Sequence, residues 1–164
     1  MFRTGAFAIP PAPLALTMGG LMPFLAAALA VWVFADDPAR QAGAQITLLA
    51  YGAVILSFLG GARWGVEMDS ASFEPPRWGV LGLSVLGSLA GWVVMLYAVL
   101  GGLFYWLFLA MAGALALHWL WDLGSQQALP AWYDGLRTLA TAGAVGSLIF
   151  AAMITGWPVW TASA

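Results

Sequence analysis

The sequence contains no cysteine and a single histidine, His118. The absence of cysteine excludes disulfide bridges, thiolate metal ligands and a cysteine nucleophile. A single histidine excludes metal or haem coordination by several histidines of one chain. We therefore expect no metal site and no cofactor. The net charge is −2 and there is no basic run, so we also expect no nucleic-acid partner.

Charged residues are scarce as well. They make up 7% of the 164 residues and hydrophobic residues make up 63%, whereas a soluble domain usually carries about 25% charged residues. So few charges cannot cover a water-soluble surface. The apolar segments are long and continuous, which predicts helices rather than the alternating strands of a β-barrel. The 10 tryptophans are typical of a membrane–water interface. The composition predicts an all-α membrane protein.

The apolar segments predict one integral membrane domain over residues 1–164, folded as a bundle of five transmembrane helices. Residues 78–121 carry no charged side chain. Because one span needs about 20 residues, this run is two helices, and the break between them is expected at Gly101-Gly102. The expected spans are residues 14–35, 44–65, 78–99, 103–121 and 138–156.

The first span contains Pro23, which we expect to kink the helix or to remove one backbone hydrogen bond. A cleaved signal peptide is the alternative, because Ala26–Ala28 offers small residues. The length of the segment, its proline and its weakly charged start argue against cleavage. A polar turn at Asp36–Arg40 separates the first two spans, and the most polar loop is expected from Glu67 to Arg77.

The placement of arginine predicts the orientation. Five spans put the two termini on opposite sides of the membrane. One side holds the N-terminus and the loops after the second and fourth spans. Four arginines fall on this side or close to it: Arg3, Arg63, Arg77 and Arg137. The other side holds Arg40, so the N-terminal side is predicted to be cytoplasmic.

Arg63 lies at the end of the second predicted span, in the segment Gly-Gly-Ala-Arg-Trp-Gly. An arginine at the edge of an apolar span must extend to water or find a partner. We expect it at the cytoplasmic-side helix end, where its long side chain reaches the interface. Glu67 follows four residues later and could pair with it on a continuing helix. His118 and Asp122 have the same spacing at the end of the fourth span.

The topology brings polar and aromatic residues from three segments into one leaflet. The predicted cluster consists of Arg63, Trp64, Glu67, His118, Asp122, Trp132, Tyr133, Asp134 and Arg137. In one interpretation these residues form a pocket for a small hydrophobic, anionic or quinone-like ligand. In the other, the charges cap helix ends, the aromatic residues form an interfacial belt, and an Arg63–Asp122 ion pair fixes the second helix against the fourth.

Small residues recur at helical spacing in several spans. Gly87 and Gly91 form a GxxxG pattern in the third span, and Gly143 and Ser147 share a face of the fifth. Such faces allow two helix backbones to approach closely in lipid. They are either contacts within a monomeric bundle or a homodimer interface, and the sequence leaves both alternatives open.

The stretch from Tyr51 to Gly65 resembles the signature of the "domain of unknown function 3429" family. Four further pieces resemble the same family: Ile9-Pro10, Gly20–Phe24, Asp122, and the segment from Trp132 to Thr141. The resemblance covers most of the chain. It implies an inner-membrane protein in bacteria and a mitochondrial one in animals, and it implies no particular reaction or ligand.

No nucleophile–base pair and no phosphate-binding glycine loop is present in the sequence. We therefore expect no catalytic residue and no enzymatic activity. The first functional hypothesis is a multi-pass inner-membrane protein that serves as an accessory, assembly or structural subunit of a larger membrane complex. The alternative is a binder or carrier of a small ligand at the cytoplasmic-side membrane edge. An ion-coupled transporter is disfavoured, because the five spans show no inverted repeat.

Overall fold

The structure is a computed structural model that describes residues 9–70, 75–124, 130 and 132–156. Within these ranges it contains helices and no strand. The helices are α1 (Pro11–Val33), α2 (Pro38–Ser70), α3 (Trp78–Leu100), α4 (Tyr105–Gly124) and α5 (Tyr133–Gly156). Each of the 5 is long and apolar enough to cross a membrane. This confirms the prediction of an all-α membrane protein with five transmembrane helices.

Helix α1 begins at Pro11, before the predicted residue 14. Proline suits the first helical position, because its fixed φ is already helical and its missing N–H would have no partner there. The N–H of Leu14 donates to the carbonyl of Pro10 at 3.2 Å, which starts the helical hydrogen-bond pattern. The helix continues through Pro23 and ends at Val33.

Helix α2 begins at Pro38 and ends at Ser70, so it is longer at both ends than the predicted span of about residues 44–65. At its start, the carboxylate of Asp37 accepts a hydrogen bond from the backbone N–H of Arg40 at 3.1 Å, as a helix-capping residue does. At its end, the polar residues after Gly65 were interpreted as a loop. Polar side chains do not stop a helix that extends beyond the hydrocarbon, and the next prolines follow only at positions 75 and 76.

The turn between α3 and α4 lies at Gly101-Gly102, as predicted. Gly102 has a φ of +101°, a conformation that glycine adopts easily and residues with a Cβ rarely adopt. Helix α4 starts at Tyr105 rather than 103 and extends to Gly124 rather than 121. Asp122 therefore lies within the last turn of α4 and does not follow its end.

Helix α5 begins at Tyr133, although the predicted span begins only at residue 138. The N–H of Tyr133 donates to the carbonyl of Pro130 at 2.8 Å, and the turn formed there leads into the helix. The charges in this segment suggested a loop, but they occupy the first turns of the helix. As a result, Arg137 and Thr141 lie four residues apart on one helical face.

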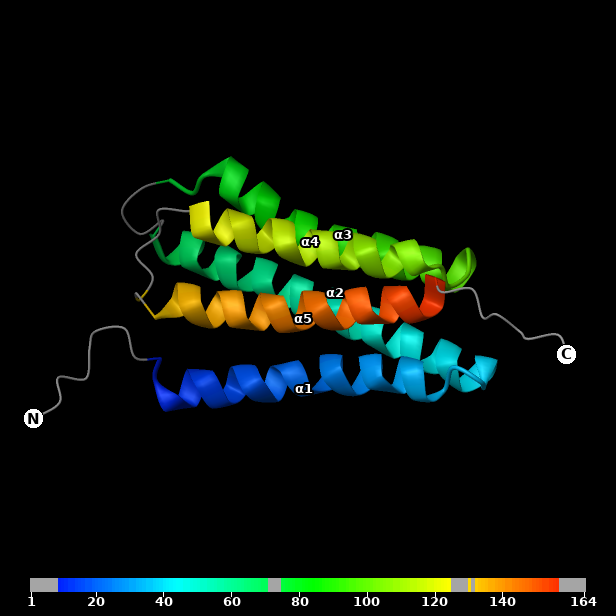
Figure 1. Ribbon diagram of the computed structural model, residues 1–164. Helices are drawn as coiled ribbons and strands as arrows, with labels where there is room; N and C mark the ends of the chain where they lie inside the picture. The colour runs from blue at the N-terminus through cyan, green and yellow to red at the C-terminus, as the bar shows by residue number, and fades with distance from the viewer. Residues whose placement is uncertain (1–8, 71–74, 125–129, 131, 157–164) are drawn as a thin grey trace, which may run out of the picture.

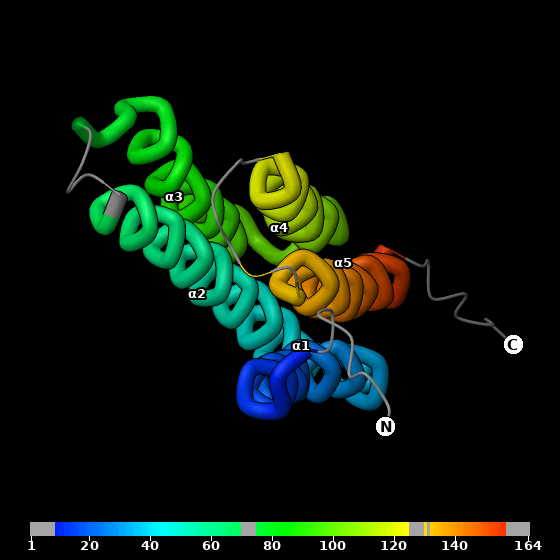
Figure 2. Tube along the Cα trace, turned by 90° about the vertical axis from the view of Figure 1, so that its left-hand side faces the viewer, coloured from blue at the N-terminus to red at the C-terminus, as the bar shows by residue number. Residues whose placement is uncertain are grey.

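The helices form one closed bundle. Each helix packs against the next in chain order, and α5 also packs against α1. In Figure 1, α5 lies between α1 and α4. Figure 2 shows that α2 crosses the bundle obliquely. Its Pro38 end lies beside α1 and its Ser70 end beside α3, so α1 and α2 diverge toward the end of the bundle where α2 finishes.

Small residues allow α2 and α3 to approach each other closely. A Cβ added at Gly60 would overlap the backbone carbonyl oxygen of Ser84. A Cβ added at Gly91 would lie 3.0 Å from both the Cα and the Cβ of Ala53. The small-residue face predicted for the third span therefore packs inside the bundle, which is one of the two alternatives stated above.

The core and the outer surface are both apolar. Every helix contributes buried side chains, for example Phe24, Leu48, Val94, Phe108 and Leu148. Large apolar side chains also cover the outside, where they are exposed in the absence of lipid. An outside of this kind suits contact with acyl chains and not with water. The surface therefore agrees with lipid as the surroundings of the bundle.

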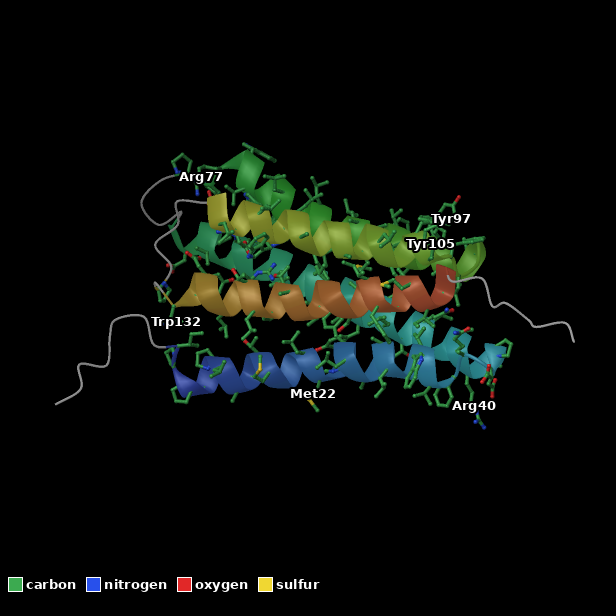
Figure 3. All side chains as sticks on the ribbon, viewed as in Figure 1. Met22, Arg40, Arg77, Tyr97, Tyr105 and Trp132 are labelled. Carbon is green, nitrogen blue, oxygen red and sulfur yellow. The ribbon has the colours of Figure 1, made fainter. Side chains whose placement is uncertain are left out.

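Polar and aromatic side chains gather at the two ends of the bundle. Arg77 and Trp132 lie at the end where α2 finishes and α5 begins, and Arg40 lies at the opposite end with Tyr97 and Tyr105 (Figure 3). Aromatic and arginine side chains at both ends are the usual anchors of a transmembrane bundle at the headgroup level.

Candidate functional site

Arg63 lies in the interior of the bundle. Its residue is 4% exposed, and its Nε donates a hydrogen bond to Oδ1 of Asp122 at 2.6 Å. Its Nη2 makes longer contacts of 3.4 Å with the backbone carbonyl oxygens of Trp121 and Asp122. The guanidinium carbon lies 4.8 Å from the centre of the Trp121 ring, in cation–π geometry. Of the two alternatives stated for Arg63, extension to water or a partner, the structure has the partner: Arg63 forms an ion pair with Asp122.

The carboxylate of Asp122 also contacts a second arginine. The Nε of Arg137 donates to its Oδ2 at 2.7 Å. The Nη1 of Arg137 donates to the hydroxyl of Thr141, one turn further along α5. Both residues are about as buried as Asp122 itself. One carboxylate on α4 therefore lies between guanidinium groups from α2 and α5.

His118 lies one turn before Asp122 on α4. Its Nδ1 is 3.4 Å from Nη2 of Arg137 and 3.6 Å from Oδ2 of Asp122. Its Nε2 is buried and has no hydrogen-bond partner among the described residues. Since an arginine can only donate, the shorter contact favours the tautomer in which Nδ1 accepts and Nε2 carries the proton. The histidine thus belongs to the same group of residues and does not form a separate site.

We call Arg63, His118, Asp122, Arg137 and Thr141 the Asp122 cluster. An unpaired charge inside a membrane protein is strongly unfavourable, but a charge with a close counter-ion and further hydrogen bonds is tolerated. Hydrogen bonds that involve two ionised groups are also about twice as strong as neutral ones. The cluster joins α2, α4 and α5, three of the helices that are long and apolar enough to cross a membrane.

A second ion pair joins α2 to the start of α3. Glu67 is 2% exposed and accepts three hydrogen bonds from Arg77. The backbone N–H of Arg77 donates at 2.7 Å and its Nη2 at 2.8 Å. Arg77 is the residue before α3, so this contact holds the beginning of α3 against the last turns of α2. The sequence suggested Arg63 as the partner of Glu67, but it did not suggest Arg77.

The other predicted site residues lie around the cluster and outside it. Trp64 is 42% exposed, and Asp134 is exposed on the first turn of α5. The rings of Trp132 and Tyr133 are 6.4 Å apart at the same end of the bundle. Thr141 was not predicted as a site residue. A predicted helix that starts at Tyr133 would have placed it on the same face as Arg137, because the two residues are four positions apart.

A cavity adjoins the cluster on the side of α1. It has a volume of about 380 Å³ and lies between α1, α2 and α5. Its walls are mainly apolar, but Tyr133, Arg137 and Thr141 also line it. Among the described residues, no group of three His, Cys, Asp or Glu side chains could hold a metal ion. Arg137 can only donate hydrogen bonds, so it suits an anion or another hydrogen-bond acceptor.

These features define a multi-pass membrane protein in which a buried charge cluster joins the transmembrane helices. The chain belongs to the family described as "Protein of unknown function (DUF3429)", whose model matches residues 9–153. This confirms the resemblance found in the sequence. The matched region contains every residue of the Asp122 cluster.

One curated relative is Transmembrane protein 69 from Xenopus tropicalis. It is 36% identical over 140 residues, which are 85% of this chain and 53% of the relative. The chain therefore spans about half the length of that relative. No solved structure gives a significant match.

Proposed function

We propose that this chain is a non-enzymatic accessory or assembly subunit of a larger membrane complex. The observation that carries the proposal is a groove on the outside of the bundle between α1 and α5. It has a volume of about 420 Å³. Small residues of α5 form its floor and larger apolar residues form its rim. The residues that line the groove are Leu25, Ala28, Leu29, Ala142, Gly143, Gly146, Ser147 and Phe150.

Helices associate in lipid mainly where small residues let the backbones approach, because lipid tails already solvate large apolar side chains. Gly146 in this groove is exposed, and a Cβ added there would have no neighbour within 4 Å. Leu25 and Leu29 are each 53% exposed along the rim. This geometry supports the docking of a transmembrane helix of another protein, with its side chains against the floor of the groove.

The Asp122 cluster supports a non-enzymatic role. Asp122 contacts both arginines, and Arg137 further contacts Thr141 and His118. These contacts join members of the cluster to one another. We infer that the cluster holds α2, α4 and α5 in place and does not carry out a reaction.

The partner groove can be tested with a matched pair of glycine substitutions. Gly146→Leu should fill the groove and abolish co-purification of the partner in mild detergent. Gly113→Leu is the control, because Gly113 is also an exposed helical glycine without neighbours within 4 Å, but it lies on α4. Tagged wild-type protein and both variants are purified after crosslinking in the membrane, and the associated proteins are identified.

We expect the wild type and Gly113→Leu to retain a partner and Gly146→Leu to lose it. The affinity for the partner should fall about tenfold or more if the contact contributes about 1.4 kcal/mol or more. A wild-type protein that elutes as a monomer without any associated protein would overturn the proposal. If the chain instead associates with itself and Gly146→Leu abolishes this association, the groove is a homodimer interface. That outcome would also overturn the accessory role.

We further propose that the chain lies in a bacterial inner membrane, with the end where α2 finishes on the cytoplasmic side. Arg77 lies at that end and Arg63 and Arg137 in the half of the bundle that leads to it, whereas Arg40 lies at the other end (Figure 3). Excess arginine marks the cytoplasmic side. Arg3, which contributed to the predicted orientation, lies outside the described residues.

The absence of cysteine makes this orientation simple to measure. Asp36→Cys and Pro76→Cys each introduce one exposed thiol, at opposite ends of the bundle. In intact spheroplasts, a membrane-impermeant maleimide should label Asp36→Cys at once and Pro76→Cys only after the membrane is permeabilised. The reverse pattern would place the arginine-rich end outside and refute the orientation.

A second candidate function is the binding of a small hydrophobic or anionic ligand at the membrane edge. The observation that favours it is the cavity between α1, α2 and α5, which Arg137 lines. An accessory subunit and a ligand binder differ in one measurable respect: only the binder should retain a small molecule when the protein is isolated alone.

A further inference from the structure

The cavity between α1, α2 and α5 has a long apolar part. Leu21 and Phe24 from α1 and Ile55 and Leu59 from α2 form its walls. Figure 2 shows that α2 leans away from α1 toward its Ser70 end, with α5 packed beside α1. The rim carries side chains that are strongly exposed, among them Phe58, at 67%. The cavity is therefore accessible from the lipid-facing side of the bundle.

The polar part of the same cavity is formed by α5. Arg137 has five N–H groups on three nitrogens. Its Nε donates to Asp122, one N–H of Nη1 to Thr141, and one N–H of Nη2 approaches His118. Each terminal nitrogen thus has a second N–H without a partner among the described residues. A buried donor without a partner is unfavourable, and a cationic donor gains most from an anionic oxygen.

We propose that this cavity binds a single-chain anionic amphiphile, a fatty-acid carboxylate, with its head group at Arg137 and its alkyl chain between α1 and α2. This inference rests on the second candidate function, the binding of a small ligand. The carboxylate accepts hydrogen bonds from the remaining N–H groups of Arg137. The phenol of Tyr133 lines the same cavity. The chain then occupies the space that the divergence of α1 and α2 leaves open.

The volume of the cavity favours one chain over two. About 380 Å³ lies near the lower end of the range of ~300–1,000 Å³ that ligand sites usually occupy. A diacyl phospholipid would have to leave one chain outside the cavity. A short carboxylate would contact Arg137 but would leave the apolar walls unfilled, and each methylene that moves from water into the cavity contributes about fourfold to affinity.

The experiment compares three probes on the full chain in nanodiscs of zwitterionic lipid. Radiolabelled palmitate has the charge and the chain, hexadecanol has the chain without the charge, and octanoate has the charge with a shorter chain. Because a charged hydrogen bond is lost, hexadecanol should bind about tenfold more weakly than palmitate. Octanoate should bind still more weakly at the same free aqueous concentration, since fewer of its methylenes leave water.

Variants of α1 test the location without altering the Asp122 cluster. Gly20 lines the cavity, and a Cβ added there would meet only the hydroxyl of Tyr51, at 3.9 Å. Gly20→Leu should therefore fold and fill the cavity, and it should weaken palmitate binding about tenfold or more, since several buried methylenes are displaced. Gly19→Leu is the control, because Gly19 is exposed and has no neighbour within 4 Å. It should leave palmitate binding unchanged.

The outcomes separate the ligand class from the function on which it rests. If hexadecanol binds as tightly as palmitate and Gly20→Leu weakens both, the cavity binds a ligand but the carboxylate assignment fails. If phosphatidylglycerol displaces palmitate with higher affinity, a phospholipid replaces the fatty acid and the single-chain assignment fails. If no probe distinguishes Gly20→Leu from Gly19→Leu, the proposed cavity ligand and the second candidate function both fail.

Discussion

Replacing Asp122 by alanine is expected to lower the free energy of unfolding by about 3–5 kcal/mol, the range for loss of one partner of a buried ion pair. The carboxylate accepts hydrogen bonds from Arg63 at 2.6 Å and from Arg137 at 2.7 Å. Its removal leaves two guanidinium groups in the interior without this counter-ion. Neither can lose its charge, because an arginine side chain stays protonated in proteins.

The measurement is unfolding of the purified protein in detergent micelles, followed by circular dichroism and tryptophan fluorescence. Arg40→Ala is the control, since Arg40 forms an ion pair with Asp37 at 3.3 Å in which both side chains are well exposed. Loss of an exposed pair should change stability by less than about 1 kcal/mol. The loss of stability in Asp122→Asn should lie between those of Asp122→Ala and Arg40→Ala, because asparagine keeps a hydrogen-bond acceptor but lacks the charge. Equal stability of Asp122→Ala and Arg40→Ala would show that the cluster does not hold the bundle together.

The second large effect is expected from a single added methyl group between α2 and α3. Gly60→Ala should destabilise the protein by about 1–3 kcal/mol, the usual range for overpacking of a well-packed interface. The added Cβ would overlap the carbonyl oxygen of Ser84, a backbone atom that cannot turn aside as a side chain could. The two helices would have to separate, and the contacts on both sides of Gly60 would weaken.

The adjacent residue provides a matched control. A Cβ added at Gly61 has no neighbour within 4 Å, so Gly61→Ala should fit without any shift. It should stabilise the protein slightly, by up to about 1 kcal/mol, because alanine favours helix over glycine. Both variants are compared by the same unfolding measurement. A result in which Gly60→Ala and Gly61→Ala shift stability equally would refute the close approach of α2 and α3 at this position.

Much of the fold was predictable because it depends on local properties of the chain. Long apolar segments without charge must become helices in a membrane, since every backbone polar group needs a partner within the chain. The turn at Gly101-Gly102 was predictable for the same kind of reason: it is the one glycine pair within a charge-free run that is too long for one helix. The helix limits were less predictable. At Ser70 and Tyr133, charged residues continue or begin a helix that extends beyond the apolar segment.

Four of the five residues of the Asp122 cluster were predicted from the sequence, and Thr141 was not. The alternating direction of the helices is enough to bring Arg63, Asp122 and Arg137 into one leaflet. It does not specify that Arg63 turns inward to Asp122, or that Glu67 contacts Arg77. These contacts depend on how far each helix rotates about its own axis, which the sequence does not state directly.

By itself, the sequence determined that this protein crosses the membrane with five helices and brings Arg63, Asp122 and Arg137 toward the same end of the bundle. Hydrophobicity and span length decide both, and both can be read along the chain. Only the tertiary structure decided that Arg63 and Asp122, 59 residues apart, share a hydrogen bond in the interior. The close packing of α2 against α3 at Gly60 and Gly91 sets the position of α2, and the start of α5 at Tyr133 places Arg137 on the same carboxylate. Such contacts arise from packing between helices, and no single segment of the chain contains them.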